Sequence, residues 1–117
     1  MIGGQVDKGT VLTLARRHGG ARVEAIALSD IEAAMEVKSG RADYYLGACL
    51  TGGGGLAMAI ALLGIERCVT VSSPGRPPKP EEIRKHVRAG KKAFGFTADH
   101  AEAAVPAIIQ ALLEVAE

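Results

Sequence analysis

Short apolar runs alternate with segments of helical periodicity along the chain. The apolar runs predict strands at 1–2, 22–28, 42–50, 67–73 and 93–98. Between and after them, apolar positions on one side and polar positions on the other predict helices around 11–17 and over 31–40, 53–64, 79–90 and 100–116. Parallel strands need crossover connections, so this alternation predicts a parallel sheet with helices on both faces.

We expect residues 1–117 to form a single α/β domain, with a three-layer, doubly wound parallel sheet of five strands. For a chain of this kind we expect the flavodoxin-like order 2-1-3-4-5, in which the first strand lies between the second and the third. Only Met1 and Ile2 precede Gly3 and Gly4. Either these glycines belong to the first strand, or the natural protein begins further upstream.

A run of four glycines, Gly52–Gly55, follows the third predicted strand and precedes a helix that begins near Leu56. Loops after parallel strands meet at the carboxyl edge of the sheet, and a helix N-terminus there offers unpaired N–H groups to an anion. We therefore predict a site for a small anionic metabolite, such as a phosphate or carboxylate, with Lys8 or Arg76 balancing the charge. The predicted ligand-binding residues are Gly4, Lys8, Cys49, Thr51, Gly52, Gly53, Gly54, Ser73 and Gly75.

The same glycines have a structural interpretation, in which they let the following helix pack closely on the sheet. The run is not a spaced GxGxxG, and GGQVDKGT after the first strand has lysine before glycine, the reverse of a P-loop ending. The glycines therefore indicate a position for a site and not a known phosphate motif.

Composition and charge narrow the classes of partner. The net charge is +1 and aromatic residues make up 3% of the chain, which argues against a nucleic-acid surface. The longest apolar run, Leu56–Leu63, is too short to cross a bilayer, and the N-terminus does not resemble a secretion signal, so we expect a cytoplasmic protein. No ligand spacing indicates a metal, and no motif identifies a cofactor.

Two further hypotheses compete with ligand binding. Cys49, Asp99 and His100 also lie at the predicted carboxyl edge, where a thiolate or an imidazole could serve an enzyme. Cys49 could equally be a small core residue and His100 part of a helix cap, while Cys68 is expected in the core. Alternatively, the chain could be a non-catalytic subunit of a larger assembly or a homo-oligomer, with its Ala-rich helices as the interface and no ligand of its own. The glycine-rich edge could also bind a protein partner in place of a metabolite.

The segment 31–55 reads IEAAMEVKSGRADYYLGACLTGGGG. This pattern resembles that of the YhfU-like family of small uncharacterised bacterial proteins, a domain of unknown function. The shared pattern extends from about Asp30 to the end of the chain, and the N-terminal strand of the family is longer. The matching residues are Glu32–Met35, Val37–Gly40, Asp43–Tyr45, Gly47–Cys49, Thr51, Gly52, Gly54, Pro74–Gly75 and Ala93–Gly95. The resemblance implies no activity and no catalytic residues.

The size and strand pattern are also similar to those of IIB components of sugar phosphotransferase systems. Those proteins carry a phosphorylatable cysteine in the loop after the first strand, where this chain has GGQVDKGT. We therefore do not expect phosphorelay through a cysteine, even if the fold is shared.

Overall fold

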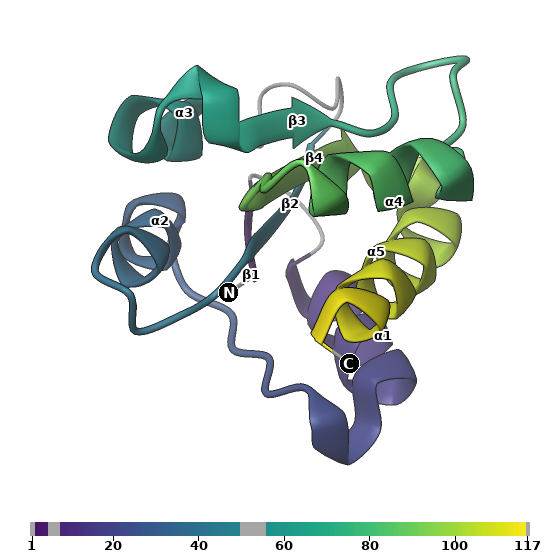
Figure 1. The fold of residues 1–117 in the computed structure, drawn as a ribbon, viewed down its shortest axis with the longest axis horizontal. Coiled ribbons are helices and arrows are strands. Elements are labelled where there is room, and N and C mark those ends of the chain that lie inside the picture. The colour runs from purple at the N-terminus through teal and green to yellow at the C-terminus, as the bar shows by residue number, and fades with distance from the viewer. Residues whose placement is uncertain (1, 5–7, 50–55, 117) are drawn as a thin grey trace.

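The computed structural model describes residues 2–4, 8–49 and 56–116. Their chain order alternates between strand and helix, apart from one consecutive pair of helices (Figure 1). The elements are β1 (Ile2–Gly4), α1 (Lys8–Gly19), α2 (Asp30–Lys38), β2 (Tyr45–Cys49), α3 (Ala57–Leu63), β3 (Cys68–Thr70), α4 (Pro80–Arg88), β4 (Ala93–Thr97) and α5 (Ala101–Ala116), with short 3₁₀ turns η1 (Gly20–Arg22), η3 (Ile65–Arg67) and η4 (Ala98–His100).

The described strands form one parallel sheet between two layers of helices. Helices α1, α4 and α5 cover one face, and α2 and α3 cover the other (Figure 1). The prediction of an α/β fold with a parallel sheet is therefore confirmed.

The predicted strand order is wrong at one end of the sheet. The observed order is β1-β2-β4-β3, so β4 is inserted beside β2 and β3 lies at the edge. Right-handed crossovers that run in opposite directions along a sheet must cross opposite faces. The connection from β3 to β4 runs toward β2, opposite to the connection from β2 to β3, so α4 must cover the face opposite to α3. It does so, because Ile83 and Val87 of α4 are buried in the core cluster shared with α1 and α5.

The predicted strand 22–28 is also largely wrong. Residues 20–22 form η1, and the segment after it pairs with β1 through one isolated parallel bridge between Ile2 and Ala27. The Ile2 N–H donates to the Ile26 carbonyl at 2.8 Å, and the Leu28 N–H donates to the Ile2 carbonyl at 3.0 Å. Gly3 and Gly4 belong to β1, which lies between this segment and β2, as expected.

The two faces of the sheet carry different side chains because successive strand residues point to opposite sides. Toward α1, α4 and α5 point large apolar residues, including Leu46, Phe94 and Phe96. Toward α2 and α3 the central row consists of three glycines in register, Gly3, Gly47 and Gly95. Tyr44 packs on the first cluster and Tyr45 belongs to the second, so the tyrosines point to opposite faces, as the strand prediction requires.

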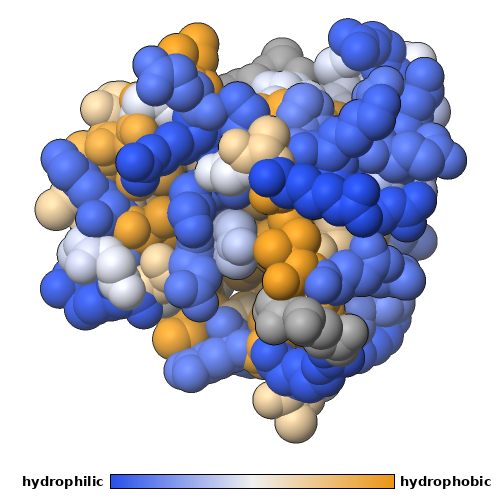
Figure 2. All heavy atoms as spheres, in the orientation of Figure 1, coloured by the Kyte–Doolittle hydropathy of each residue, from blue (hydrophilic) through white to orange (hydrophobic). Residues whose placement is uncertain are grey.

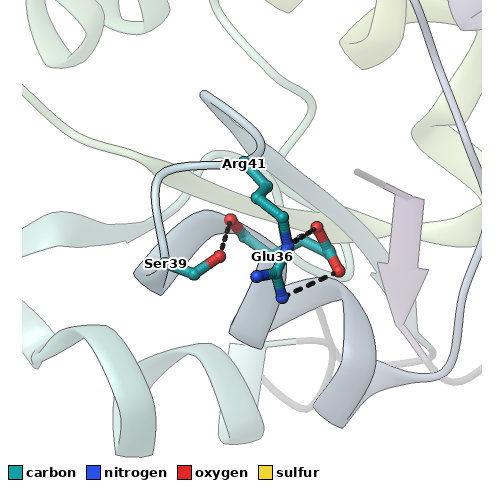
Figure 3. Close-up of polar contacts among 3 residues, drawn as sticks. All are labelled: Glu36, Ser39 and Arg41. Carbon is teal, nitrogen blue, oxygen red and sulfur yellow. Dashed lines mark hydrogen bonds and ion pairs between the residues drawn. The ribbon is translucent and has the colours of Figure 1, made fainter.

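Helix α2 shows how local sequence sets its ends. The Ser29 hydroxyl caps the helix by accepting the Glu32 N–H at 3.3 Å, and it donates to the Glu32 carboxylate at 2.9 Å. At the other end, Arg41 binds both carboxylate oxygens of Glu36, at 2.8 and 3.2 Å, and the Ser39 hydroxyl donates to the Glu36 carbonyl (Figure 3). The ion pair lowers the pKa of Glu36 and raises the pKa of Arg41.

Candidate functional site

A chain of polar contacts crosses the carboxyl ends of β3 and β4. The Thr97 backbone N–H donates to the Ser72 hydroxyl at 3.0 Å, and the two hydroxyl oxygens lie 3.4 Å apart. Thr97 Oγ1 lies 2.5 Å from Nδ1 of His100. Ser72 is 4% exposed and Thr97 is 1% exposed, and they are the buried polar residues of the described part of the chain. We call Ser72, Thr97 and His100 the hydroxyl–histidine chain.

The fold places this chain at the carboxyl ends of two neighbouring strands. β4 ends at Thr97, and η4 then turns the chain so that His100 folds back onto Thr97 just before α5 begins. The His100 side chain keeps 18% of its surface exposed, and its Nε2 lies 3.9 Å from the exposed carboxylate of Asp99. One end of the hydroxyl–histidine chain is therefore buried in the sheet, and the other reaches the surface.

Cys49 lies beside this chain in the sheet. It is the register partner of Thr97 in the neighbouring strand, which puts both side chains on the face covered by α2 and α3. Cys49 is 1% exposed, so its thiol lies in the interior, as the core interpretation expects. Cys68 is also buried, and burial raises the pKa of its thiol, with Lys91 partly opposing that shift.

Ser73 and Gly75, two other predicted ligand residues, belong to a tight turn. Ser73 and Arg76 exchange backbone hydrogen bonds at 3.1 and 2.9 Å, and Gly75 has φ +76°. Pro-Gly at the centre of a turn with positive φ at the glycine is typical of a type II turn. The turn geometry therefore accounts for Gly75 without a ligand.

The remaining predicted residues are only partly described. Gly4 ends β1 opposite Ala48 of β2, and Lys8 begins α1. Thr51, Gly52, Gly53 and Gly54 lie outside the described residues. The helix predicted after the glycines does begin where expected, with buried Leu56 as its N-cap, but α3 has only seven residues.

Sequence reasoning missed Ser72 and Thr97. It predicted Ser73 as a ligand residue, yet the structure buries the preceding serine. Thr97 was not predicted as a site residue, because it ends the otherwise apolar strand AFGFT and is part of that strand. A hydroxyl residue at the carboxyl end of a buried strand is the signal that could have identified both.

A cavity lies elsewhere, at the amino ends of the strands. It has a volume of about 330 Å³ and is lined by apolar side chains of α1, α5 and β2, together with Tyr44. Arg22, Glu24, Arg41 and Asp43 add charges of both signs to its lining. This cavity and the hydroxyl–histidine chain lie at opposite edges of the sheet.

Residues 2–4, 8–49 and 56–116 contain neither a metal-ligand cluster nor a membrane-spanning helix. Within these ranges, no cluster of three or more His, Cys, Asp or Glu side chains could hold a metal ion. No described helix is both long enough and apolar enough to cross a membrane.

Comparison with known proteins gives consistent relatives. Residues 1–112 match the family model described as protein of unknown function DUF2620. The chain is 47% identical over 90 residues to "Uncharacterized protein YhfU" of Escherichia coli strain K12 and to the protein of the same name from Shigella flexneri. The match covers 76% of this chain and 77% of each relative. No solved structure matches, and the similarity to IIB components stays a prediction.

Proposed function

The chain belongs to the DUF2620 family of proteins of unknown function, and we propose that it binds a small anionic metabolite at the carboxyl edge of its sheet. The observation that carries this proposal is the hydroxyl–histidine chain, in which two buried hydroxyls orient one partly exposed imidazole. Ligands of open α/β sheets bind outside the carboxyl ends of the strands. We propose the cytoplasm as its compartment.

The direction of the hydrogen bonds favours His100 as a donor. Ser72 accepts the Thr97 N–H, and its own proton has Thr97 Oγ1 within reach. We propose the tautomer in which the Thr97 hydroxyl donates to Nδ1 of His100 and the ring proton lies on Nε2. Nε2 lies 3.9 Å from the Asp99 carboxylate. An outward N–H donor suits an oxygen of a phosphate or carboxylate.

Cations in the loop after β3 support an anionic ligand over a neutral one. This loop carries exposed Arg76 and Lys79. Asp99 and Glu102 flank His100 in sequence and limit the positive charge there. The ligand we propose is therefore small and singly or doubly charged, so that a few cations suffice.

A thermal-shift screen with phosphorylated and carboxylated metabolites tests the proposal. A ligand at about 100 times its Kd should stabilise the fold by about 2.7 kcal/mol. Thr97→Val and His100→Ala should reduce the ligand-induced shift, whereas His18→Ala, on the exposed surface of α1, should leave it unchanged. Equal shifts in all three variants would contradict binding at this edge.

Burial of Cys49 favours binding over an enzyme that uses this thiol as a nucleophile. A buried thiol is shielded from reagents, so we expect iodoacetamide to modify Cys49 slowly in the folded protein. Fast modification of Cys49 with the fold intact would instead favour the enzyme hypothesis.

A second candidate site is the cavity of about 330 Å³ at the amino edge, whose apolar lining suits a ligand with an apolar body. Ala25 lines this cavity. Ala25→Leu should fill part of it and reduce binding there, without changing any ligand effect that depends on His100.

A further inference from the structure

We propose that the cavity at the amino edge of the sheet binds a free α-amino acid with an apolar side chain. This inference rests on the second candidate site described above and is independent of the hydroxyl–histidine chain at the other edge. Its basis is a pattern of backbone groups that continues past the amino end of β1.

The cavity lies in line with β1, beyond the amino end of that strand. Residues 22–26 line it on one side and residues 41–44 on the other, and Ile2 lines it as well. The same two stretches of chain continue into the neighbours of β1, because Ile2 pairs in parallel with Ala27 and with Leu46. The cavity therefore occupies a position of the sheet that no described strand fills.

The stretch beside β1 shows how one residue is held at such a position. The Ile2 N–H donates to the Ile26 carbonyl at 2.8 Å, and the Leu28 N–H donates to the Ile2 carbonyl at 3.0 Å. A residue opposite Ala27 is thereby bound through both its N–H and its C=O, as in any parallel ladder.

The same pair of groups recurs two residues earlier, beside the cavity. Val23 is extended, with φ −132° and ψ 130°, so the Glu24 carbonyl and the Ile26 N–H face the cavity on either side of Ala25. Neither group has a hydrogen bond to a residue that the structure describes. A ligand opposite Ala25 completes the ladder if it carries an N–H donor and an oxygen acceptor on the two sides of one carbon atom.

An α-amino acid carries these two groups as an ammonium and a carboxylate, and the charges of the cavity suit both. Arg22, Arg41, Glu24 and Asp43 line it. Both signs remain when Arg41 is set aside as the partner of Glu36. A ligand with one charge of each sign fits this mixed lining better than a ligand with a net charge.

The side chain of the ligand meets apolar atoms. Register partners in a parallel pair point to the same face, and Ile2 and Ala27 both pack in the core cluster under α1 and α5. A ligand opposite Ala25 therefore directs its side chain toward Ile109 and Leu112 of α5, which line the cavity. The volume of about 330 Å³ is near the lower end of the range of about 300–1,000 Å³ for ligand pockets, which suits a small ligand.

This apolar lining is separate from the outer surfaces of the helical layers. Figure 2 shows apolar side chains gathered over α2 and α3 and hydrophilic ones over α4. No described side chain of these three helices lines the cavity. Its apolar walls include Leu46 and Ile109 of the core cluster, so a bound apolar side chain extends the core.

Isothermal titration calorimetry of the full chain with L-leucine tests the proposal. We expect saturable binding of L-leucine. The analogue 4-methylpentanoate lacks the ammonium group, leucinamide lacks the carboxylate and glycine lacks the apolar side chain. Each should bind at least about tenfold more weakly than L-leucine, because each lacks one of the three contacts.

A proline at position 26 tests the backbone contact directly. Ile26→Pro removes the N–H that faces the cavity, and it should raise the Kd for L-leucine at least about tenfold. Ile26→Ala is the matched control, because it shortens the same side chain and keeps the N–H, so its Kd should match that of the wild type. Far-ultraviolet circular dichroism reports whether both variants fold. If Ile26→Pro does not fold, Ala25→Leu, which fills the cavity, takes its place, with exposed Ala61→Leu of α3 as the control.

The outcomes separate this inference from the proposal for the carboxyl edge. Failure of the wild type to bind L-leucine overturns the inference, as does equal binding of L-leucine and 4-methylpentanoate. Binding that neither Ile26→Pro nor Ala25→Leu weakens overturns it by placing the amino acid elsewhere. His100→Ala should leave the Kd for L-leucine unchanged. Loss of leucine binding in that variant would assign the amino acid to the carboxyl edge and overturn the inference alone.

Discussion

The two faces of the sheet differ in what their side chains do. The face under α1, α4 and α5 carries Leu46, Phe94 and Phe96, which are buried in a continuous apolar core. The face under α2 and α3 carries a row of glycines and, at its carboxyl end, Thr97. The first face holds most of the large apolar side chains, and the second carries the buried hydroxyl beside which we propose that a ligand binds.

The largest expected effect comes from the face of the sheet under α1, α4 and α5. Phe96 is fully buried, and Phe96→Ala should reduce the free energy of unfolding by about 3–5 kcal/mol, through lost burial and a cavity. The next residue of β4, Thr97, points to the other face and supplies the control, because Thr97→Val keeps the side-chain volume and should cost much less. Urea denaturation measures both. If both variants lost a similar amount of unfolding free energy, both faces would contribute equally to stability, contrary to this account.

The next largest effect is expected at Gly3, where the ring of Tyr45 packs against the backbone. A Cβ at this position would lie 2.5 Å from Cε2 of Tyr45, which is too close for real atoms. Gly3→Ala should therefore destabilise the fold by about 1–3 kcal/mol, as overpacking does.

A double-mutant cycle identifies the cause of that loss. In a Tyr45→Leu background the ring that meets the new methyl group is gone, so Gly3→Ala should cost less there. An unchanged cost would show that Gly3 is required for backbone reasons and not for the approach of Tyr45.

Smaller effects are expected from the two tyrosine hydroxyls. Tyr44→Phe and Tyr45→Phe should each change the free energy of unfolding by only about 1 kcal/mol, the net scale of one hydrogen bond. Neither residue belongs to the hydroxyl–histidine chain, so ligand binding should be unaffected. If either variant folds but no longer binds, the site extends beyond the carboxyl edge.

The smallest effect concerns the exposed ion pair at the end of α2. The Glu36 pKa is lowered by Arg41, so the pair contributes stability above the ordinary glutamate pKa of about 4.3 and loses it as the pH falls through the lowered value. Arg41→Ala should lower the melting temperature slightly at pH 7, and the difference from wild type should vanish in acid. A difference that grows in acid would contradict this sign.

Much of the fold follows from local signals in the sequence. Ser29 with Glu32 predicts the start of α2, and Pro80 predicts the start of α4. The strand order does not follow, because both orders share the same alternation of strands and helices. The strand order depends on which face of the sheet Ile83 and Val87 of α4 pack against. That face is decided by tertiary packing and not by the local sequence.

Sequence reasoning named only some residues of the candidate site. His100 and Asp99 were named because both polar residues follow a strand directly. Ser72 was passed over for Ser73, because which of two adjacent serines points inward depends on the register of β3 against β4. Sequence periodicity cannot supply that register when the strand has only three residues.

The most direct test of the account is a backbone amide NMR titration of the full chain with inorganic phosphate and with the ligand that the thermal screen identifies. Binding at the carboxyl edge predicts chemical-shift changes at Ser72, Thr97 and His100. The core residue Phe94 should be unaffected, and the changes should be lost in the Thr97→Val variant. Changes gathered instead around Ala25 and Tyr44, at the amino-edge cavity, would contradict the central claim that this edge of the α2 and α3 face binds the ligand.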